Sequence, residues 1–211
     1  EEKRFEFAQV FHPMLDDPVA NDFRSERNAI ITGSNASGKS TFIKAAAINL
    51  ILGQSILTCT AEYATVPYCG VITSMAVRDD LLTGESYYIR EIKYLKRMVE
   101  LADSGRLIFL AIDEILKGTN TVERIAASKA VLRYFDSRNC LLMVATHDIE
   151  LAQSFDGVYS NYHFCESLED GDVVFDYTIH DGISRSSNAI RLLSVIGFPD
   201  EIIDDAMSEI I

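Results

Sequence analysis

A nine-residue stretch, residues 33–41, decides more about the fold of this chain than any other segment. Its sequence, Gly-Ser-Asn-Ala-Ser-Gly-Lys-Ser-Thr, matches the phosphate-loop pattern G-x-x-x-x-G-K-[ST] at every position. Residues 28–32 before it are typical of a short buried strand, and residues 42–57 after it are typical of a long apolar helix. The motif requires this order of strand, loop and helix, so the sequence predicts an α/β fold of the P-loop type with a mostly parallel central sheet.

The loop has the residue types needed to bind nucleotide phosphates. Gly33 and Gly38 allow the backbone to curl so that successive N–H groups point at phosphate oxygens, and the start of the helix adds positive partial charge. We expect Lys39 to reach the β- and γ-phosphates and the Ser40 hydroxyl to bind Mg²⁺. The rest of the expected nucleotide-binding loop consists of Ser34, Asn35, Ala36, Ser37 and Thr41. The alternative is a turn that binds nothing.

Two adjacent carboxylates, Asp113 and Glu114, follow the apolar run at 107–112. A run that is apolar on both faces is typical of a central parallel strand, and ligands of such sheets gather at the carboxyl ends of the strands. We expect Asp113 to hold the Mg²⁺ shell, and Glu114 to orient or deprotonate a water that attacks the γ-phosphate. The alternative is that the two carboxylates cap a following helix.

Two further polar residues are candidates for the same site. His147 follows the apolar run at 141–146, where it could sense or hydrogen-bond the γ-phosphate, although a single histidine can also be structural. Ser86 lies in the first turn of a helix expected over residues 85–102, where a hydroxyl and free N–H groups could meet an anion. From spacing alone, a helix cap without a ligand is the simpler interpretation of Ser86.

Composition limits the partners and the compartment. Asp and Glu number 32 against 19 Lys and Arg, and the net charge of -13 is opposite to that of a duplex-DNA-binding surface, so DNA contact is expected through another domain or a small patch. The four cysteines have no zinc spacing and indicate core thiols of a reducing compartment, by default the cytoplasm. No stretch approaches the roughly 18 apolar residues of a membrane span. The first residue, Glu1, suggests a piece of a longer protein.

The rest of the chain is expected to complete one domain over residues 1–211. Residues 1–24 would form a strand and a loop that either borders the nucleotide base or is a plain connection, and residues 25–183 would form the P-loop core. Within that core, strands over 158–165 and 173–179 are expected to form a hairpin through the turn at 168–172. Residues 184–211 would form two short helices, the second of which could pack on the domain or on a partner.

Several motifs together resemble the C-terminal ATPase domain of the MutS family, a branch of the ABC-type ATPases, over nearly the whole chain. Residues 31–41 are similar to T-G-P-N-M-G-G-K-S-T, and residues 113–121 are similar to D-E-x-x-R-G-T-S-T. Residues 79–91 resemble D-D-L-x-x-G-x-S-T-F-x-x-E, and residues 145–147 match A-T-H. Residues 11–13 and 20–21 resemble the family's R-H-P…A-N entry. Residues 181–182 and 197–199 resemble its D-G and its late G-x-P.

The resemblance implies roles that spacing does not supply. Ser86 would face nucleotide bound to a second subunit, which makes two composite ATP sites in a homodimer, and Asn120 is a second candidate for this trans site. Tyr177 falls where the family places an aromatic residue or a histidine against adenine. ATP binding and hydrolysis would drive a clamp-like cycle, with DNA held by domains absent from this chain.

The leading hypothesis is therefore a Mg²⁺-dependent ATPase of a MutS-like mismatch repair protein, with Glu114, His147 and Lys39 as catalytic residues. The alternative is a nucleotide-gated dimerisation module of a divergent MutS-like or other ABC-type protein. A transporter cassette is disfavoured because the chain contains no L-S-G-G-Q sequence. A P-loop kinase is also disfavoured because Glu114 suggests water as the acceptor.

Overall fold

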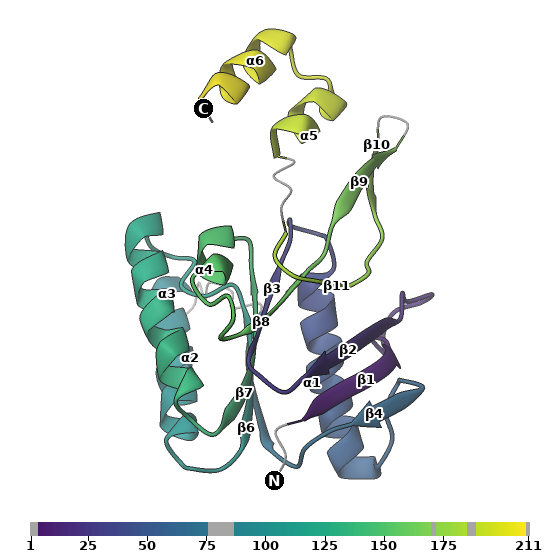
Figure 1. The fold of residues 1–211 in the computed structure, drawn as a ribbon, viewed down its shortest axis with the longest axis vertical. Helices are drawn as coiled ribbons and strands as arrows, with labels where there is room; N and C mark the ends of the chain where they lie inside the picture. The colour runs from purple at the N-terminus through teal and green to yellow at the C-terminus, as the bar shows by residue number, and fades with distance from the viewer. Residues whose placement is uncertain (1–3, 76–86, 170–171, 185–188, 210–211) are drawn as a thin grey trace.

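A central six-stranded sheet carries the fold, which we describe from a computed structural model covering residues 4–75, 87–169, 172–184 and 189–209 (Figure 1). The strand order is β11-β8-β3-β7-β6-β5; the strands from β8 to β5 pair in parallel, and β11 pairs antiparallel with β8. These strands are β3 (Ala29–Thr32), β5 (Gly70–Ser74), β6 (Ile108–Asp113), β7 (Cys140–Thr146), β8 (Ser160–His163) and β11 (His180–Asp181). The predicted mostly parallel sheet of an α/β fold is confirmed.

Helices cover both faces of this sheet. In Figure 1 the sheet is seen nearly edge-on, with α1 on one side and α2, α3 and α4 on the other. The helices of the described residues are α1 (Lys39–Ile56), α2 (Tyr87–Ala102), α3 (Thr121–Asp136), α4 (Ile149–Gln153), α5 (Ala189–Ile196) and α6 (Asp200–Ser208). None of the helices that the structure describes combines the length and apolarity that crossing a bilayer needs.

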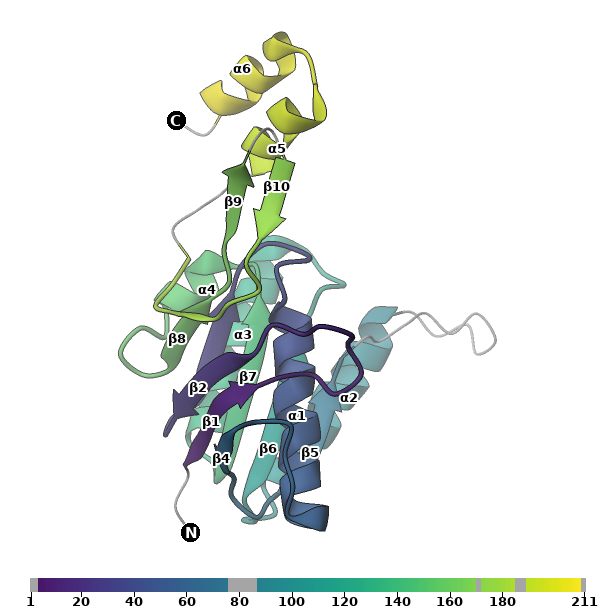
Figure 2. The same ribbon diagram turned by 90° about the vertical axis from the view of Figure 1, so that its right-hand side faces the viewer.

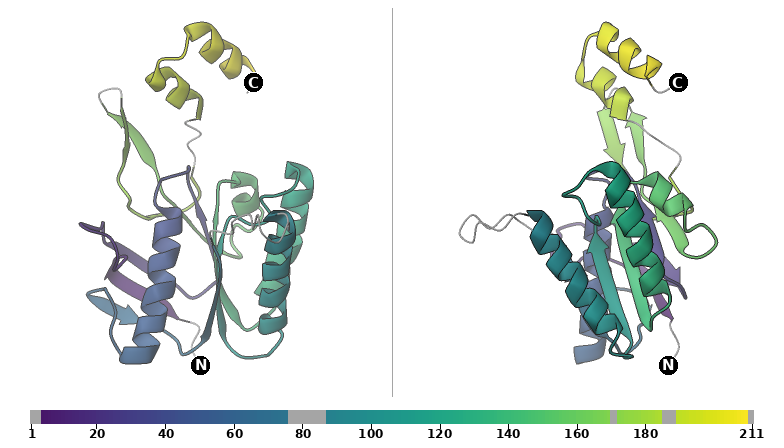
Figure 3. Two further views of the ribbon diagram at one scale, coloured as in Figure 1. Left: turned by 180° about the vertical axis from the view of Figure 1, so that it is seen from behind. Right: turned by 90° about the vertical axis from the view of Figure 1, so that its left-hand side faces the viewer.

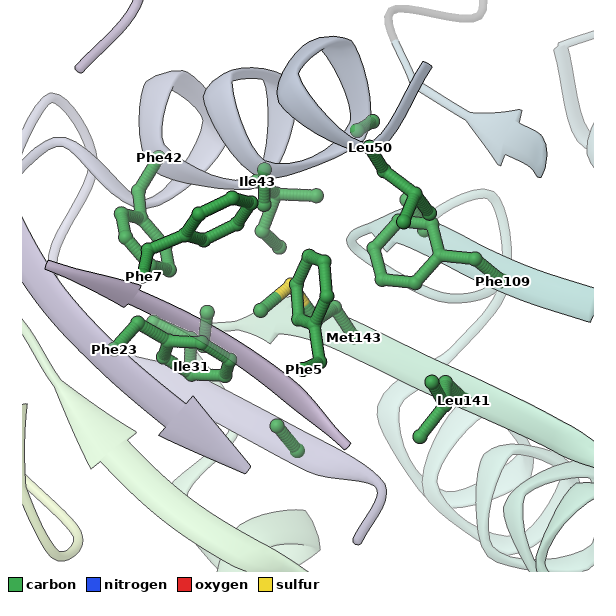
Figure 4. Close-up of a cluster of buried hydrophobic side chains, with 14 of the residues drawn as sticks. Phe5, Phe7, Phe23, Ile31, Phe42, Ile43, Leu50, Phe109, Leu141 and Met143 are labelled. Carbon is green, nitrogen blue, oxygen red and sulfur yellow. The ribbon is translucent and has the colours of Figure 1, made fainter. Parts of the chain in front are cut away.

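A small antiparallel sheet lies beyond α1. It consists of β2 (Asn21–Ser25), β1 (Phe5–Val10) and β4 (Tyr63–Thr65), in that order. In strand β1, Phe5, Phe7 and Val10 are buried and pack in one cluster with residues of α1. The alternation of buried and less buried residues is interrupted between Phe7 and Val10, where the register with β2 shifts. The helix therefore lies between two sheets, and this explains why its apolar residues spread over a wide face (Figure 4).

The predicted hairpin over 158–165 and 173–179 is wrong in its pairing. Its first strand belongs to the central sheet, where β8 pairs with β3, and the hairpin consists of β9 (Glu166–Glu169) and β10 (Asp172–Phe175) instead. The reason is that Tyr162 and Phe164 are buried in the main core, which ties this segment to the sheet before the hairpin begins. Figure 2 shows the hairpin projecting from the sheet toward α5 and α6.

The core on the α1 side is rich in phenylalanine. Phe5 lies 4.8 Å from Phe7 and 5.3 Å from Phe109, measured between ring centroids. Phe109 comes from β6, so these contacts join the small sheet to the central one, as Figure 4 shows. On the opposite face, apolar residues of α2, α3 and β6 form a second buried cluster that includes Met98, Leu110, Leu132 and Phe135.

The register of the parallel strands aligns their carboxyl ends. Thr32 of β3 pairs with Thr146 of β7, and Asp113 of β6 pairs with Ala145 of β7. Each of these strands is followed by a polar segment: the 33–41 loop follows β3, Glu114 follows β6 and His147 follows β7. The three segments therefore emerge at one edge of the sheet, the edge nearest α5 and α6 in Figure 3.

Replacing Phe109 tests the contact between the two sheets. Phe109→Ala removes a side chain that is 1% exposed, so we expect the free energy of unfolding to fall by about 3–5 kcal/mol. Val122→Ala, at a position that is 80% exposed, is the control and should change stability by less than about 0.5 kcal/mol. Chemical denaturation measures both. Equal effects of the two substitutions would contradict this account of the core.

Candidate functional site

The 33–41 loop follows β3 and has the curled backbone that its glycines predict. Gly33 has a φ of 146° and Gly38 a φ of 113°, values that side-chain-bearing residues rarely adopt. A Cβ atom at Gly33 would lie 2.7 Å from the carbonyl oxygen of Phe164, so space as well as backbone conformation excludes a side chain there. Ala36 is also left-handed, with a φ of 68°. Glycine is thus required at the point where the loop leaves the strand.

Lys39, the first residue of α1, is buried with its ammonium group inside the loop. Its Nζ donates to the carbonyl oxygens of Gly33 at 2.7 Å and Ser34 at 2.6 Å. Burial lowers the pKa of Lys39, while the negative charges of Glu114 and Asp113 act in the opposite direction. Both partners are neutral carbonyls, so the positive charge remains available to an anion that enters beside the loop.

Glu114 lies at the tip of β6 and is buried beside His147. Its Oε2 is 2.8 Å from Nδ1 of His147, and its backbone N–H donates to the carbonyl of Ala145 at 3.0 Å. Burial alone would raise the pKa of Glu114, but the hydrogen bond and charge of His147, with the charges of Lys117 and Lys39, lower it overall. The same hydrogen bond raises the pKa of His147. These contacts favour the ionised form of Glu114 although the side chain is buried.

A cavity of about 160 Å³ brings the loop and the carboxylates together. From the loop side it is lined by Asn35, Ala36, Gly38, Lys39, Ser40 and Thr41. From the other side it is lined by Asp113, Glu114, Lys117 and Tyr177. The predicted phosphate loop and the predicted carboxylates thus face one space, and His147 is connected to it through Glu114.

A second cavity, of about 300 Å³, shares Gly38, Thr41 and Tyr177 with the first. Its wall is mostly apolar and includes Phe11, Leu15, Val19, Phe42, Ala45 and Phe164. The 11–22 segment, for which the sequence left a base-side loop and a plain connection open, therefore borders this cavity. A polar cavity and an apolar cavity meet at Gly38, where an added Cβ would lie 3.3 Å from the ring of Tyr177.

The donor set of the polar cavity suits a hard cation. Ser40 contributes a hydroxyl and Asp113 a carboxylate, and both line the same space. Oxygen ligands of this kind, completed by phosphate oxygens and water, are those that Mg²⁺ prefers. The residues present therefore fit the predicted metal.

The sequence profile of MutS domain V matches residues 29–210. The chain belongs to the MutS domain V family. Similar proteins include DNA mismatch repair protein MutS 2 of Haloarcula marismortui, 33% identical over 194 residues, which are 90% of this chain and 20% of that protein.

Two further similar proteins are each named DNA mismatch repair protein MutS. The protein of Pseudothermotoga lettingae is 33% identical over 205 residues, 93% of this chain and 25% of that protein. The protein of Thermus thermophilus is 28% identical over 200 residues, 92% of this chain and 24% of that protein. This MutS domain V therefore spans about a fifth to a quarter of the length of these relatives.

The remaining predicted residues of this MutS domain V have different surroundings. Ser86 lies outside the described residues. Asn120 is the N-cap of α3, where its side chain accepts from the backbone N–H of Glu123 at 3.0 Å. Because Asn120 caps this helix, the alternative that Asp113 and Glu114 cap it is wrong. The Ser34 hydroxyl donates to Glu166 at 2.8 Å, and the hydroxyl of Ser37 is buried without a hydrogen-bond partner in the described part of the chain.

Two residues support the site although neither was among the residues predicted for it. Asn21 holds the Tyr177 segment, since its Nδ2 donates to the carbonyl of Tyr177 at 3.1 Å and its Oδ1 accepts from the N–H of Ile179 at 2.7 Å. Glu91 of α2, the last residue of the motif at residues 79–91, is only 2% exposed and accepts from the N–H of Lys117 at 3.1 Å. Helical periodicity places Glu91 on a face without showing that a loop covers this face.

Glu91 joins α2 to the loop that follows Glu114. Burial raises the pKa of Glu91. The backbone N–H groups of residues 116–118 donate to its carboxylate and partly offset this rise. The loop also lies so close to the helix that a Cβ added at Gly118 would be 2.7 Å from the Cβ of Tyr88. Only glycine fits at this position. The tip of β6 is therefore anchored to α2 by a buried carboxylate.

Removing this carboxylate should loosen the loop. In Glu91→Ala we expect the amides of residues 116–118 to exchange hydrogen about 10- to 100-fold faster, since a buried hydrogen bond to a charged group contributes roughly 1.5–3 kcal/mol. Glu91→Gln keeps an acceptor oxygen and should show a smaller effect. Hydrogen exchange with mass spectrometry measures this, with Glu100→Ala on the exposed face of α2 as the control. Unchanged exchange in Glu91→Ala would show that the carboxylate does not anchor the loop.

Proposed function

We propose that this MutS domain V binds ATP with Mg²⁺ and hydrolyses it to ADP and phosphate. The observation that carries the proposal is the pair of cavities that meet at Gly38, Thr41 and Tyr177. The polar cavity matches the triphosphate in chemistry, and the mostly apolar one matches the nucleoside. We also propose that the domain is a member of the ABC-type ATPases, as the sequence motifs suggest.

Binding would use the loop as an anion site. The curled backbone and the N-terminal end of α1 favour negative charge at the loop. Lys39 would exchange the carbonyl oxygens of Gly33 and Ser34 for phosphate oxygens. Tyr177 is 45% exposed and lines both cavities, so its ring can stack on a base while the phosphates reach the loop.

Hydrolysis would use the charges fixed at the tip of β6. A water oxygen attacks the γ-phosphorus, the bond from that phosphorus to the bridging oxygen breaks, and ADP leaves. Glu114, held ionised beside His147, accepts a hydrogen bond or the proton from the attacking water. Lys39 stabilises negative charge that develops on the transferred phosphoryl group and the leaving oxygen.

Mg²⁺ would be held by the Ser40 hydroxyl and the Asp113 carboxylate. When bound, it would neutralise charge on the β- and γ-phosphates. Ser40 follows Lys39 directly in the first turn of α1, and Asp113 ends β6. Asp113 therefore lies at a strand end, and Ser40 lies in the helix that follows the loop after β3, at the same edge of the sheet.

We propose further that the domain works as a homodimer within a longer DNA mismatch repair protein. Two composite ATP sites would then form, with Ser86 and Asn120 contributed by the facing subunit. DNA would be held by parts of the protein outside this chain, which fits its net charge of -13. The names of the similar proteins and the share of their length that this chain spans support this arrangement.

Glu114→Gln tests the proposed reaction. The amide keeps the shape of the side chain but is not a base, so we expect hydrolysis to fall by roughly 10²- to 10⁴-fold while nucleotide affinity stays nearly unchanged. Steady-state phosphate release and calorimetric titration with a slow ATP analogue measure the two quantities, over a range of chain concentrations because the site is proposed to form between subunits.

Glu62→Gln is the matched control, since it makes the same chemical change at an exposed residue outside the cavity lining. It should behave as the unmodified chain does. Unaltered hydrolysis in Glu114→Gln would remove Glu114 from the mechanism. Failure of the unmodified chain to bind any nucleotide would overturn the proposed function itself.

Tyr177→Ala tests which cavity receives the base. Loss of aromatic stacking on a base costs about 1–3 kcal/mol, so we expect the dissociation constant of the ATP analogue to rise roughly 5- to 150-fold. Tyr177→Phe should retain affinity. Tyr68→Ala, at an exposed tyrosine away from both cavities, is the control. Equal affinity of Tyr177→Ala and the unmodified chain would exclude base binding against this ring.

A further inference from the structure

Three metal-ligating side chains meet at the open end of the β9–β10 hairpin. Cys165 lies between β8 and β9, Asp176 directly follows β10, and His180 begins β11. One ligand atom from each residue lies within 4.8 Å of the other two. We propose that Cys165, Asp176 and His180 form a zinc site, separate from the proposed nucleotide and magnesium site and independent of its activity.

The two distances from Asp176 to the other ligands are close to those of a tetrahedral zinc centre, and the Cys165 and His180 ligand atoms lie within 4.8 Å of each other. Oδ2 of Asp176 lies 3.7 Å from Sγ of Cys165 and 2.9 Å from Nε2 of His180. Zinc binds sulfur at about 2.3 Å and nitrogen or oxygen at about 2.0–2.2 Å, so neighbouring ligands of a tetrahedron lie roughly 3.3–3.6 Å apart. Shifts of a few tenths of an ångström at these two contacts would bring the carboxylate to these separations.

A second layer of hydrogen bonds holds the central ligand. Oδ1 of Asp176 accepts from the backbone N–H of Thr178 at 3.0 Å, which leaves Oδ2 directed at the other two ligands. Asn21 binds the backbone on both sides of Thr178, at Tyr177 and Ile179. Such outer contacts orient the ligands of metal sites and reduce the ordering that binding requires.

The other two ligands are fixed by the sheet. His180 pairs with His163 across the antiparallel strands β11 and β8. Cys165 follows β8 at the point where Phe164 is buried and its backbone N–H donates to the carbonyl of Thr32 at 2.9 Å. All three ligands therefore come from backbone whose position is set by other contacts.

The ligand chemistry selects zinc over magnesium or calcium. A thiolate and an imidazole are poor ligands for hard cations and suit Zn²⁺, and the carboxylate completes a three-ligand set. On binding, the Cys165 thiol releases its proton to solvent, and Nε2 of His180 binds as an unprotonated nitrogen. The thiolate and the carboxylate together balance the two charges of the ion. Half-exposure of Asp176 and His180 leaves room for water as the fourth ligand.

Bound zinc would join the start of the hairpin to the segment that carries Tyr177. Asp176 and His180 lie on either side of Tyr177 in sequence, and Cys165 follows the central strand β8. Zinc would thus restrict the backbone of residues 176–180. This consequence concerns a structural position and does not require that the chain hydrolyse ATP.

The test is cobalt titration of the tag-free chain, with no nucleotide present and with thiols reduced. Co²⁺ in a tetrahedral site with a thiolate ligand gives intense visible bands and a sulfur-to-metal charge-transfer band, which Zn²⁺ then abolishes by displacement. We expect one equivalent of Co²⁺ per chain, displaced by Zn²⁺ and unaffected by excess Mg²⁺. Cys165→Ser should lose the charge-transfer band, and His180→Ala should weaken binding at least 10-fold.

Cys69→Ser, which removes a thiol elsewhere in the fold, is the matched control and should bind as the unmodified chain does. Circular dichroism of the metal-free variants checks that they fold. The cobalt titration of the unmodified chain is decisive even if a variant fails to fold. Absence of a thiolate-to-cobalt charge-transfer band in its spectrum overturns the proposal. The same holds if Cys165→Ser keeps the band.

Discussion

The parallel register of β3, β7 and β6 is the constraint on which the rest of the structure depends. Pairing Thr32 with Thr146 and Asp113 with Ala145 brings three strand ends to one level. The strand pairing alone is therefore enough to bring the polar residues that follow these strands close together. Apolar side chains on both faces of the strands are buried against helices. The close packing of these side chains opposes a shift of register, because each side chain would have to leave the neighbours it now fits.

The charged groups at the carboxyl edge of the central sheet each have hydrogen-bond partners close by in the fold. The ammonium of Lys39 is held by carbonyls of its own loop, and the carboxylate of Glu114 by His147. Neither group is paired directly with the other, although each affects the pKa of the other. A buried charge without such contacts would cost several kcal/mol. The arrangement keeps a positive and a negative group available on facing sides of one cavity.

Much of the fold and part of the candidate site could be predicted from the sequence because the signals are local. The strand, loop and helix around Gly33 are consecutive, and the apolar runs before Asp113 and His147 identify central strands by their lack of alternation. Topological rules for parallel sheets then place their carboxyl ends together. The sequence could therefore predict that Lys39 and the carboxylates face one cavity, and the structure brings them together there.

The sequence by itself determined three features of this protein. These are the succession of strand, loop and helix around Gly33, the left-handed conformation of the glycine loop, and the identity of the polar residues at the ends of the central strands. Tertiary structure alone decided that β8 joins the central sheet, that Glu91 is buried beneath a loop, and that Asn21 holds the Tyr177 segment. It also decided that Cys165 meets Asp176 and His180, although the cysteines have no metal-binding spacing in the sequence. The physical reason is that periodicity reports whether a face is buried, whereas the identity of the covering group depends on contacts between distant segments.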